Sequence, residues 1–149
     1  MTDTPTPTLR GQGAAGAAPS PLARSAGAPA RTTILVVEDN PDILRYLVLL
    51  LEQAGHRVRP AATLGEAVAL ADSGPVDLLL SDIGLPDGSG LELIAHLRSV
   101  RPELPAVAFS GFGSDDDIRA SLDAGFAAHL TKPLDFRRLS EAIRNALTE

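Results

Sequence analysis

Five side chains capable of chemistry stand where separate apolar segments of the chain end. They are three carboxylates, one hydroxyl and one ammonium: Glu38, Asp39, Asp82, Ser110 and Lys132. If each apolar segment is a strand of one open parallel sheet, the carboxyl ends of the strands meet at one edge, where such folds bind ligands. The five side chains would then converge at one point. Carboxylates beside a hydroxyl and an ammonium could hold a divalent metal ion and a phosphoryl group.

Each of these residues also has an ordinary structural explanation when it is taken alone. Asp82 could cap a turn or a helix, and Glu38 with Asp39 could favour the start of the following helix. Ser110 could be a turn serine, and Lys132 could be a solvated surface lysine. Their coincidence at four different strand ends favours the functional interpretation.

The segments around these residues alternate between strand and helix patterns. Apolar runs bounded by turn residues predict strands, and apolar residues at helical spacing predict helices. The predicted strands are 33–37, 56–61, 77–81, 105–110 and 127–131, and the predicted helices begin near residues 41, 64, 91, 115 and 135. Short alternating units predict an α/β fold, a doubly wound five-stranded parallel sheet with five helices that cover both of its faces.

Local signals refine this arrangement. Asn40 and Pro41 suit the N-cap and the first position of the first helix. The polar strand 56–61 is expected near an edge of the sheet, and the glycines between Gly84 and Gly90 predict a loop. The last helix is expected to bury Phe136, Leu139, Ile143 and Leu147.

The composition limits the classes to which the chain can belong. Its 149 residues suit one domain, and 44% of them are hydrophobic, which is enough for a core. Residues 1–32 are rich in Ala, Pro and Gly, so we expect a disordered tail before a domain at residues 33–149.

No apolar run approaches the roughly 18 residues of a membrane span. Cysteine and a secretory signal pattern are both absent, so a cytoplasmic protein is expected. The net charge of -6 argues against direct binding of nucleic acid.

Residues 33–149 resemble the receiver domain of two-component response regulators, whose fold is flavodoxin-like. The resemblance rests on four stretches in the order and spacing typical of that family: residues 34–40, residues 82–90, Ser110-Gly111 and Lys132-Pro133. Within the family, the segments that begin at Ser110 and at Ala127 are closest to receivers attached to hybrid histidine kinases.

The resemblance implies a role for each site residue. Asp82 would be the phosphorylation site that accepts a phosphoryl group from a phosphohistidine. Its partner would be a histidine kinase or a histidine phosphotransfer protein. Mg2+ would be bound by Glu38, Asp39, Asp82 and the backbone carbonyl of Gly84, as suits a cation that prefers oxygen ligands. Lys132 and Ser110 would contact the phosphoryl oxygens and complete the catalytic group.

Three further residues depend on the same resemblance. The Lys132–Pro133 peptide bond is expected to be cis, as the family implies. His129, three residues before Lys132, stands where the family often has an aromatic switch residue. It could switch against Ser110 or pack statically, and we favour the static interpretation. Phe112 is hypothesised to gate hydrolysis of the phosphorylated site.

Other classes of function were weighed against this interpretation. A pseudo-receiver would bind partners without phosphorylation, but it would not need the acidic trio, Ser110 and Lys132. A phosphatase with an aspartyl nucleophile would need an acid/base aspartate two residues after Asp82, where this chain has Gly84. We therefore expect a phosphoacceptor that transfers and slowly loses its own phosphoryl group, rather than a turnover enzyme.

The wider context is also an expectation. The chain stops about ten residues past Leu139, so we expect either a stand-alone receiver that signals by protein contacts or a module of a hybrid kinase, and Met1 favours the stand-alone receiver. Phosphorylation-dependent homodimerisation stays open. The acidic run 115–117 is interpreted as a capped helix start, and His56 and His96 as surface residues.

Overall fold

The computed structural model describes residues 32–111 and 114–148. The prediction of a disordered tail at residues 1–32 therefore lies outside the described residues, apart from Thr32. Among the residues that are described, no helix is long and apolar enough to cross a membrane.

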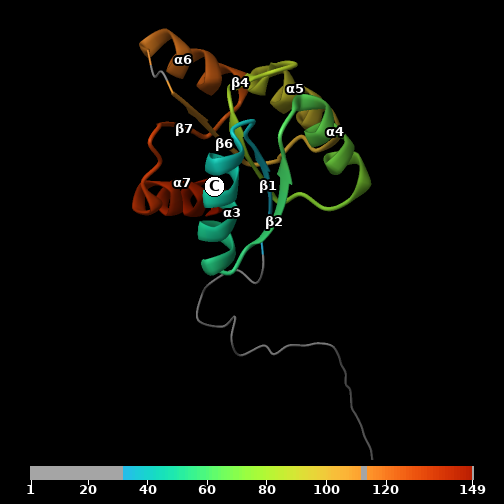
Figure 1. The fold of residues 1–149 in the computed structure, drawn as a ribbon. Helices are drawn as coiled ribbons and strands as arrows, with labels where there is room; N and C mark the ends of the chain where they lie inside the picture. Colours follow the sequence, from blue (N-terminus) through green and yellow to red (C-terminus); the bar gives the residue numbers. More distant parts are fainter. Residues whose placement is uncertain (1–31, 112–113, 149) are drawn as a thin grey trace, which may run out of the picture. The chain divides into compact units, whose positions relative to one another are not determined.

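Five parallel strands form the central sheet of the domain (Figure 1). Their order across the sheet is β2-β1-β3-β6-β7. The strands are β1 (Thr33–Val37), β2 (Arg57–Ala61), β3 (Leu78–Asp82), β6 (Ala106–Ser110) and β7 (Ala128–Thr131). The polar strand β2 lies at an edge, as predicted. The chain order reverses beside β1 and β3, so the crevice at this switch point is where an open α/β sheet binds its ligand.

Five helices cover the two faces of this sheet, which confirms the predicted doubly wound fold. They are α3 (Pro41–Gln53), α4 (Leu64–Ser73), α5 (Gly90–Val100), α6 (Asp115–Ala124) and α7 (Phe136–Thr148). Helices α3 and α7 pack on one face, whereas α4 and α5 pack on the other and α6 adds Ala124 to that second layer.

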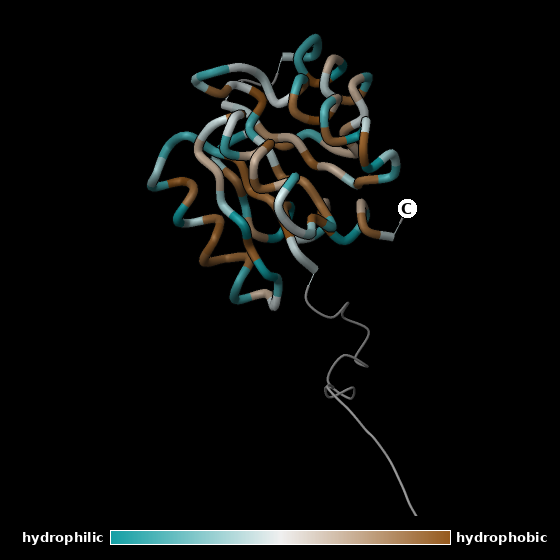
Figure 2. The backbone as a smooth tube through the Cα atoms, turned by 90° about the vertical axis from the view of Figure 1, so that its right-hand side faces the viewer, coloured by the Kyte–Doolittle hydropathy of each residue, from teal (hydrophilic) through white to brown (hydrophobic). Residues whose placement is uncertain are grey.

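The hydrophobic core consists of two layers, because successive strand residues point to opposite faces. Leu35 and Val37 of β1 belong to the layer under α4 and α5, while Ile34 and Val36 belong to the layer under α3 and α7. All four are fully buried. Burial on both faces explains why the central strands are continuously apolar (brown in Figure 2) instead of alternating.

Local capping sets where the helices begin and end. Asn40 Oδ1 accepts hydrogen bonds from the N–H groups of Asp42 and Ile43 at 2.9 and 3.2 Å, as its predicted N-cap role requires. Ser89 and Glu92 form a capping box at the start of α5. Gly125 ends α6 with φ of 117°, a conformation that favours glycine.

The segment after Asp82 differs from its prediction as a loop. It contains two very short antiparallel strands, β4 (Gly84–Leu85) and β5 (Gly88–Ser89). The N–H of Gly90 closes this hairpin by donating to the carbonyl of Ile83 at 2.8 Å. A Cβ on Gly90 would lie 2.6 Å from the carbonyl oxygen of Asp82, so the close approach requires glycine. Two-residue strands are too short to show a periodic pattern, which is why the sequence did not predict them.

The prediction that Phe136 is buried is wrong. Its side chain is 44% exposed, whereas Leu139 is fully buried and Ile143 is 3% exposed. Leu147 is partly buried against the same core layer, in agreement with its prediction. Phe136 shares the helical stripe of these residues, but it is the first residue of α7 and does not join the core layer that contains Leu139 and Ile143.

Substitutions in α7 should show different stability losses at its buried position Leu139 and its exposed position Phe136. We expect Leu139→Ala to lower the free energy of unfolding by about 2–5 kcal/mol, because it leaves a cavity in a closed core layer. Phe136→Ala should cost less than about 1 kcal/mol, as is usual for an exposed position. Urea denaturation of both variants measures the difference, and equal losses would contradict the arrangement.

Candidate functional site

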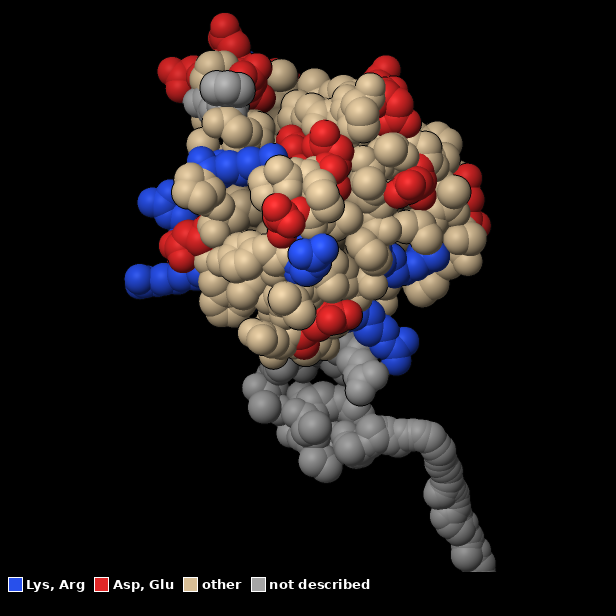
Figure 3. Space-filling model, in the orientation of Figure 1, with Lys and Arg blue, Asp and Glu red and all other residues tan. Residues whose placement is uncertain are grey.

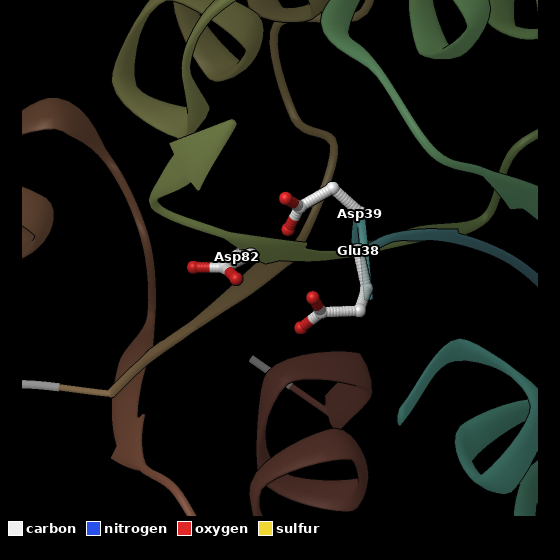
Figure 4. Close-up of side chains that lie close together, drawn as sticks. All are labelled: Glu38, Asp39 and Asp82. Carbon is white, nitrogen blue, oxygen red and sulfur yellow. The ribbon is translucent and has the colours of Figure 1, made fainter. Parts of the chain in front are cut away.

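Three carboxylates meet at the carboxyl edge of the sheet, between β1 and β3. Glu38 and Asp39 directly follow β1, and Asp82 is the last residue of β3 rather than the first residue after it. One oxygen from each carboxylate lies within 4.8 Å of the other two. Figure 4 shows the three carboxylates turned toward a common space. The trio that the sequence predicted is therefore brought together, in a geometry that could hold a metal ion.

Lys132 follows β7 and joins two of these carboxylates. Its Nζ donates a hydrogen bond to Oδ2 of Asp82 at 2.8 Å and forms an ion pair with Oε1 of Glu38, also at 2.8 Å. Both carboxylates are buried, while the lysine side chain is 21% exposed. The ammonium also lies 5.5 Å from the centre of the Phe109 ring. One cation thus offsets two buried negative charges.

Burial and the ion pairs of Lys132 shift the pKa values of Glu38 and Lys132. Burial raises the pKa of Glu38 above its ordinary value, although Lys132 and the N–H of Asn40 oppose that rise. Burial acts to lower the pKa of Lys132, but its hydrogen bonds and charge interactions with Asp82 and Glu38 outweigh burial and raise the pKa. Lys132 therefore stays protonated near neutral pH.

Backbone hydrogen bonds fix the carboxylates in place. The N–H of Asn40 donates to Oε2 of Glu38 at 2.8 Å, and the N–H of Glu38 donates to the carbonyl of Ala61 at 3.0 Å. Oδ1 of Asp82 accepts the N–H of Gly84 at 3.1 Å. Both oxygens of Asp82 are thus oriented, one by Lys132 and the other by the start of β4. The predicted binding of a metal ion by the carbonyl of Gly84 stays a prediction.

Ser110 and His129 lie together beside this cluster, on neighbouring strands. Oγ of Ser110 is 2.8 Å from Nε2 of His129. The other ring nitrogen, Nδ1, is 2.8 Å from Oγ of Ser121, a fully buried serine of α6. Burial lowers the pKa of His129, and the negative charge of Asp117 partly opposes this effect. The sequence suggested a contact of His129 with Ser110 but not with Ser121, because a helical serine carries no signal of such a contact.

Asp87 is a second residue that the sequence analysis did not single out. Its carboxylate accepts the N–H groups of Leu64 and Gly65 at 2.7 and 3.1 Å, across more than twenty residues of chain. These bonds lower the pKa of Asp87. They connect the hairpin after Asp82 to the first turn of α4, so they help to fix the backbone around the site.

The Lys132–Pro133 peptide bond is cis, in agreement with the sequence prediction. Ser114 caps α6 by accepting the N–H of Asp117 at 3.1 Å, so the acidic run 115–117 is a capped helix start. His96 is exposed, whereas His56 is only partly exposed. Phe112 lies outside the described residues.

The fold and the site together define a class of protein. A five-stranded parallel sheet with three carboxylates and a lysine at its carboxyl edge is the arrangement of a response regulator receiver domain. The family model of this domain matches residues 34–144, and the chain belongs to this family of two-component systems.

Individual relatives agree with this assignment. The chain is 38% identical over 117 residues to the response regulator protein PilR of Pseudomonas aeruginosa, with 78% of this chain and 26% of PilR covered. It is 39% identical over 116 residues to the KDP operon transcriptional regulatory protein KdpE of Escherichia coli, with 78% of this chain and 51% of KdpE covered. The chain thus spans about a quarter to a half of the length of these relatives.

A solved structure shows the same fold. The crystal structure of a CheY-like receiver domain protein from Methanospirillum hungatei has a TM-score of 0.75 and 35% sequence identity to this chain. The match covers 80% of this chain and 95% of that one.

Removing the ammonium of Lys132 should destabilise the metal-free protein. We expect Lys132→Gln to lower the free energy of unfolding at pH 7 in chelator by about 1–3 kcal/mol, less than for a fully buried pair because the lysine is partly exposed. Added Mg2+ should reduce the difference in free energy of unfolding between wild type and Lys132→Gln, since a divalent cation among the carboxylates offsets the same charges. Urea denaturation measures both effects, and Arg137→Gln on the exposed face of α7 is the control. Equal stability of Lys132→Gln and wild type would contradict this role.

The lowered pKa of His129 makes folding depend on pH in a defined direction. The unfolded chain binds a proton near the ordinary value of 6.5, and the folded protein binds it only at lower pH. The contribution of His129 is therefore fully present above that value and is lost as pH falls toward the folded pKa. Between about pH 7.5 and 5.5, His129→Gln should lose less stability than wild type. His96→Gln, an exposed histidine, should follow wild type, and parallel losses in all three proteins would overturn the expectation.

Proposed function

We propose that this receiver domain is phosphorylated on Asp82 by a phosphohistidine of a histidine kinase or a histidine phosphotransfer protein. The observation that carries the proposal is the cluster itself. Three carboxylate oxygens lie within 4.8 Å of one another, and Lys132 contacts two of these carboxylates at 2.8 Å. A domain that only bound partners would have no need to bury like charges around one lysine.

The donor set fits Mg2+. Carboxylate oxygens are the ligands that this cation prefers, with water and phosphate oxygens completing the octahedron. Oε1 of Glu38 is buried and forms an ion pair with Lys132 at 2.8 Å. Asp39 is exposed, so its carboxylate is accessible from solvent. Glu38, Asp39 and Asp82 would hold the ion, and when bound it would offset negative charge between Asp82 and the incoming phosphoryl group.

The chain's own residues have separate tasks in the transfer. A carboxylate oxygen of Asp82 attacks phosphorus, and the P–N bond of the phosphohistidine breaks with its electron pair on the departing imidazole nitrogen. Lys132 keeps its proton and stabilises charge that develops on the phosphoryl oxygens. The hydroxyl of Ser110 donates to one of those oxygens. The bond from Gly84 keeps the attacking carboxylate oriented, so little reorganisation accompanies the step.

The same site supports a phosphoacceptor rather than a turnover enzyme. Gly84 occupies the position two residues after Asp82, so no side chain is available there for acid/base catalysis. Loss of the phosphoryl group would then be slow and would depend on water that reaches the site. Phosphorylation would bias an equilibrium between two conformations and be detected by a protein partner.

Charge on the surface is compatible with protein partners. Acidic side chains are numerous in the upper half of the face in Figure 3, toward the edge that carries the site. The chain's relatives PilR and KdpE are a response regulator and a transcriptional regulatory protein. By analogy with two-component systems, the donor would be a histidine kinase.

Intact-mass measurement after incubation with Mg2+ and acetyl phosphate tests the proposal. Wild type should gain one phosphoryl group, and the gain should vanish in chelator and in Asp82→Asn. Asp123→Asn, which removes an exposed carboxylate of α6, should label like wild type. Absence of any gain, under conditions that label another receiver, would reject phosphorylation and favour a pseudo-receiver that binds its partner without phosphate.

A further inference from the structure

A continuous chain of short contacts leads from the site into helix α6. Oγ of Ser110 lies 2.8 Å from Nε2 of His129, and Nδ1 of His129 lies 2.8 Å from Oγ of Ser121. Oγ of Ser121 in turn donates to the carbonyl of Ile118 at 2.8 Å, one turn earlier in the helix. Ser121 is fully buried, so water does not replace the two partners of its hydroxyl group.

The hydrogen-bond donors available along this series of contacts select one tautomer of the His129 imidazole. Ser121 has a single hydroxyl proton, and it is used in the bond to Ile118. Ser121 can then only accept from the ring, so Nδ1 of His129 carries a proton. The lowered pKa of His129 means that the ring is neutral and holds one proton. Nε2 is therefore a bare acceptor, and the proton of its contact with Ser110 comes from the serine hydroxyl.

We propose that Ser121 is a positioning residue that holds His129 in this tautomer and orientation, and thereby keeps the hydroxyl proton of Ser110 directed away from the phosphoryl site. The proposal rests on the proposed function, since it assigns Ser110 to a phosphoryl oxygen in the phosphorylated state. Ser121 of α6 would then be one of the residues that determine how favourable the phosphorylated state is.

The consequence is a competition for one proton. A phosphoryl group on Asp82 recruits the Ser110 hydroxyl, and Nε2 of His129 then loses its donor in a partly buried position. An acceptor left without a partner is costly, so the imidazole is driven to leave its place between the two serines. The bond to Ser121 opposes that movement. It therefore stabilises the unphosphorylated arrangement and couples the site to α6.

The first arm of the test examines the tautomer without metal or phosphate. In 15N NMR spectra of the full chain labelled at histidine, His129 of wild type should show a protonated Nδ1 and a bare Nε2. Ser121→Ala should shift the ring toward the other tautomer or toward tautomer exchange. Ser99→Ala is the matched control, because Ser99 also donates to a carbonyl three residues earlier, that of His96, at 2.6 Å. A protonated Nε2 in wild type would overturn the proposal.

The second arm measures the coupling with beryllofluoride, which mimics the phosphoryl group on an aspartate. In the presence of Mg2+, Ser121→Ala should bind beryllofluoride about threefold to tenfold more tightly than wild type, the size expected for loss of one buried hydrogen bond. Ser99→Ala should match wild type. Unchanged or weaker binding by Ser121→Ala would overturn the coupling.

The two arms distinguish this inference from the proposed function. If wild type does not bind beryllofluoride at all, the proposed function fails and the coupling fails with it, whereas the NMR arm still decides the tautomer. If wild type binds but Ser121→Ala is unchanged, the proposed function stands and only the role of Ser121 is rejected.

Discussion

The pairing of Lys132 with Glu38 and Asp82 is the interaction on which the rest of the site depends. Two buried carboxylates repel each other, and burial alone disfavours their charged forms. The ammonium at 2.8 Å from each offsets both effects and connects the ends of β1, β3 and β7 at one edge. The same charges that make this arrangement costly without a cation make it suited to hold a metal ion.

The fold supplies this site through its topology. Parallel strands end at the same edge, so residues far apart in sequence converge without any local signal between them. The N–H of Lys132 donates to the carbonyl of Ser110, which joins the ends of β6 and β7. The hairpin after Asp82 is bonded through Asp87 to the start of α4. The site is thus held by strand ends and short turns, while the helices mainly supply the two core layers.

The sequence was sufficient for the parts of the structure that depend on periodicity and topology. Continuous apolar runs and capping residues such as Asn40 located the strands and helices. The rule that parallel strands end at one edge of a sheet then placed Glu38, Asp39, Asp82 and Lys132 together. The failures have a common cause. Phe136 follows the correct helical stripe, yet the stripe does not reveal that the first residue of the helix stays outside the core layer. Ser121 resembles Ser99 in sequence, and only packing distinguishes a serine that contacts an imidazole from one that faces solvent.

His129 shows how one substitution within a family pattern can alter the physics of a site. A phenol has a single polar atom, whereas an imidazole has two on opposite sides of the ring and can contact Ser110 and Ser121 at once. The ring therefore has a directional hydrogen-bond chain that a phenol could not form. These two contacts favour the observed position of the ring, and under the proposed mechanism the static and switching interpretations would be compatible, because the ring would be held until a phosphoryl group recruits Ser110. Since one of these contacts is to Ser121, the proposed equilibrium would depend on α6, and a partner that moves α6 would alter it.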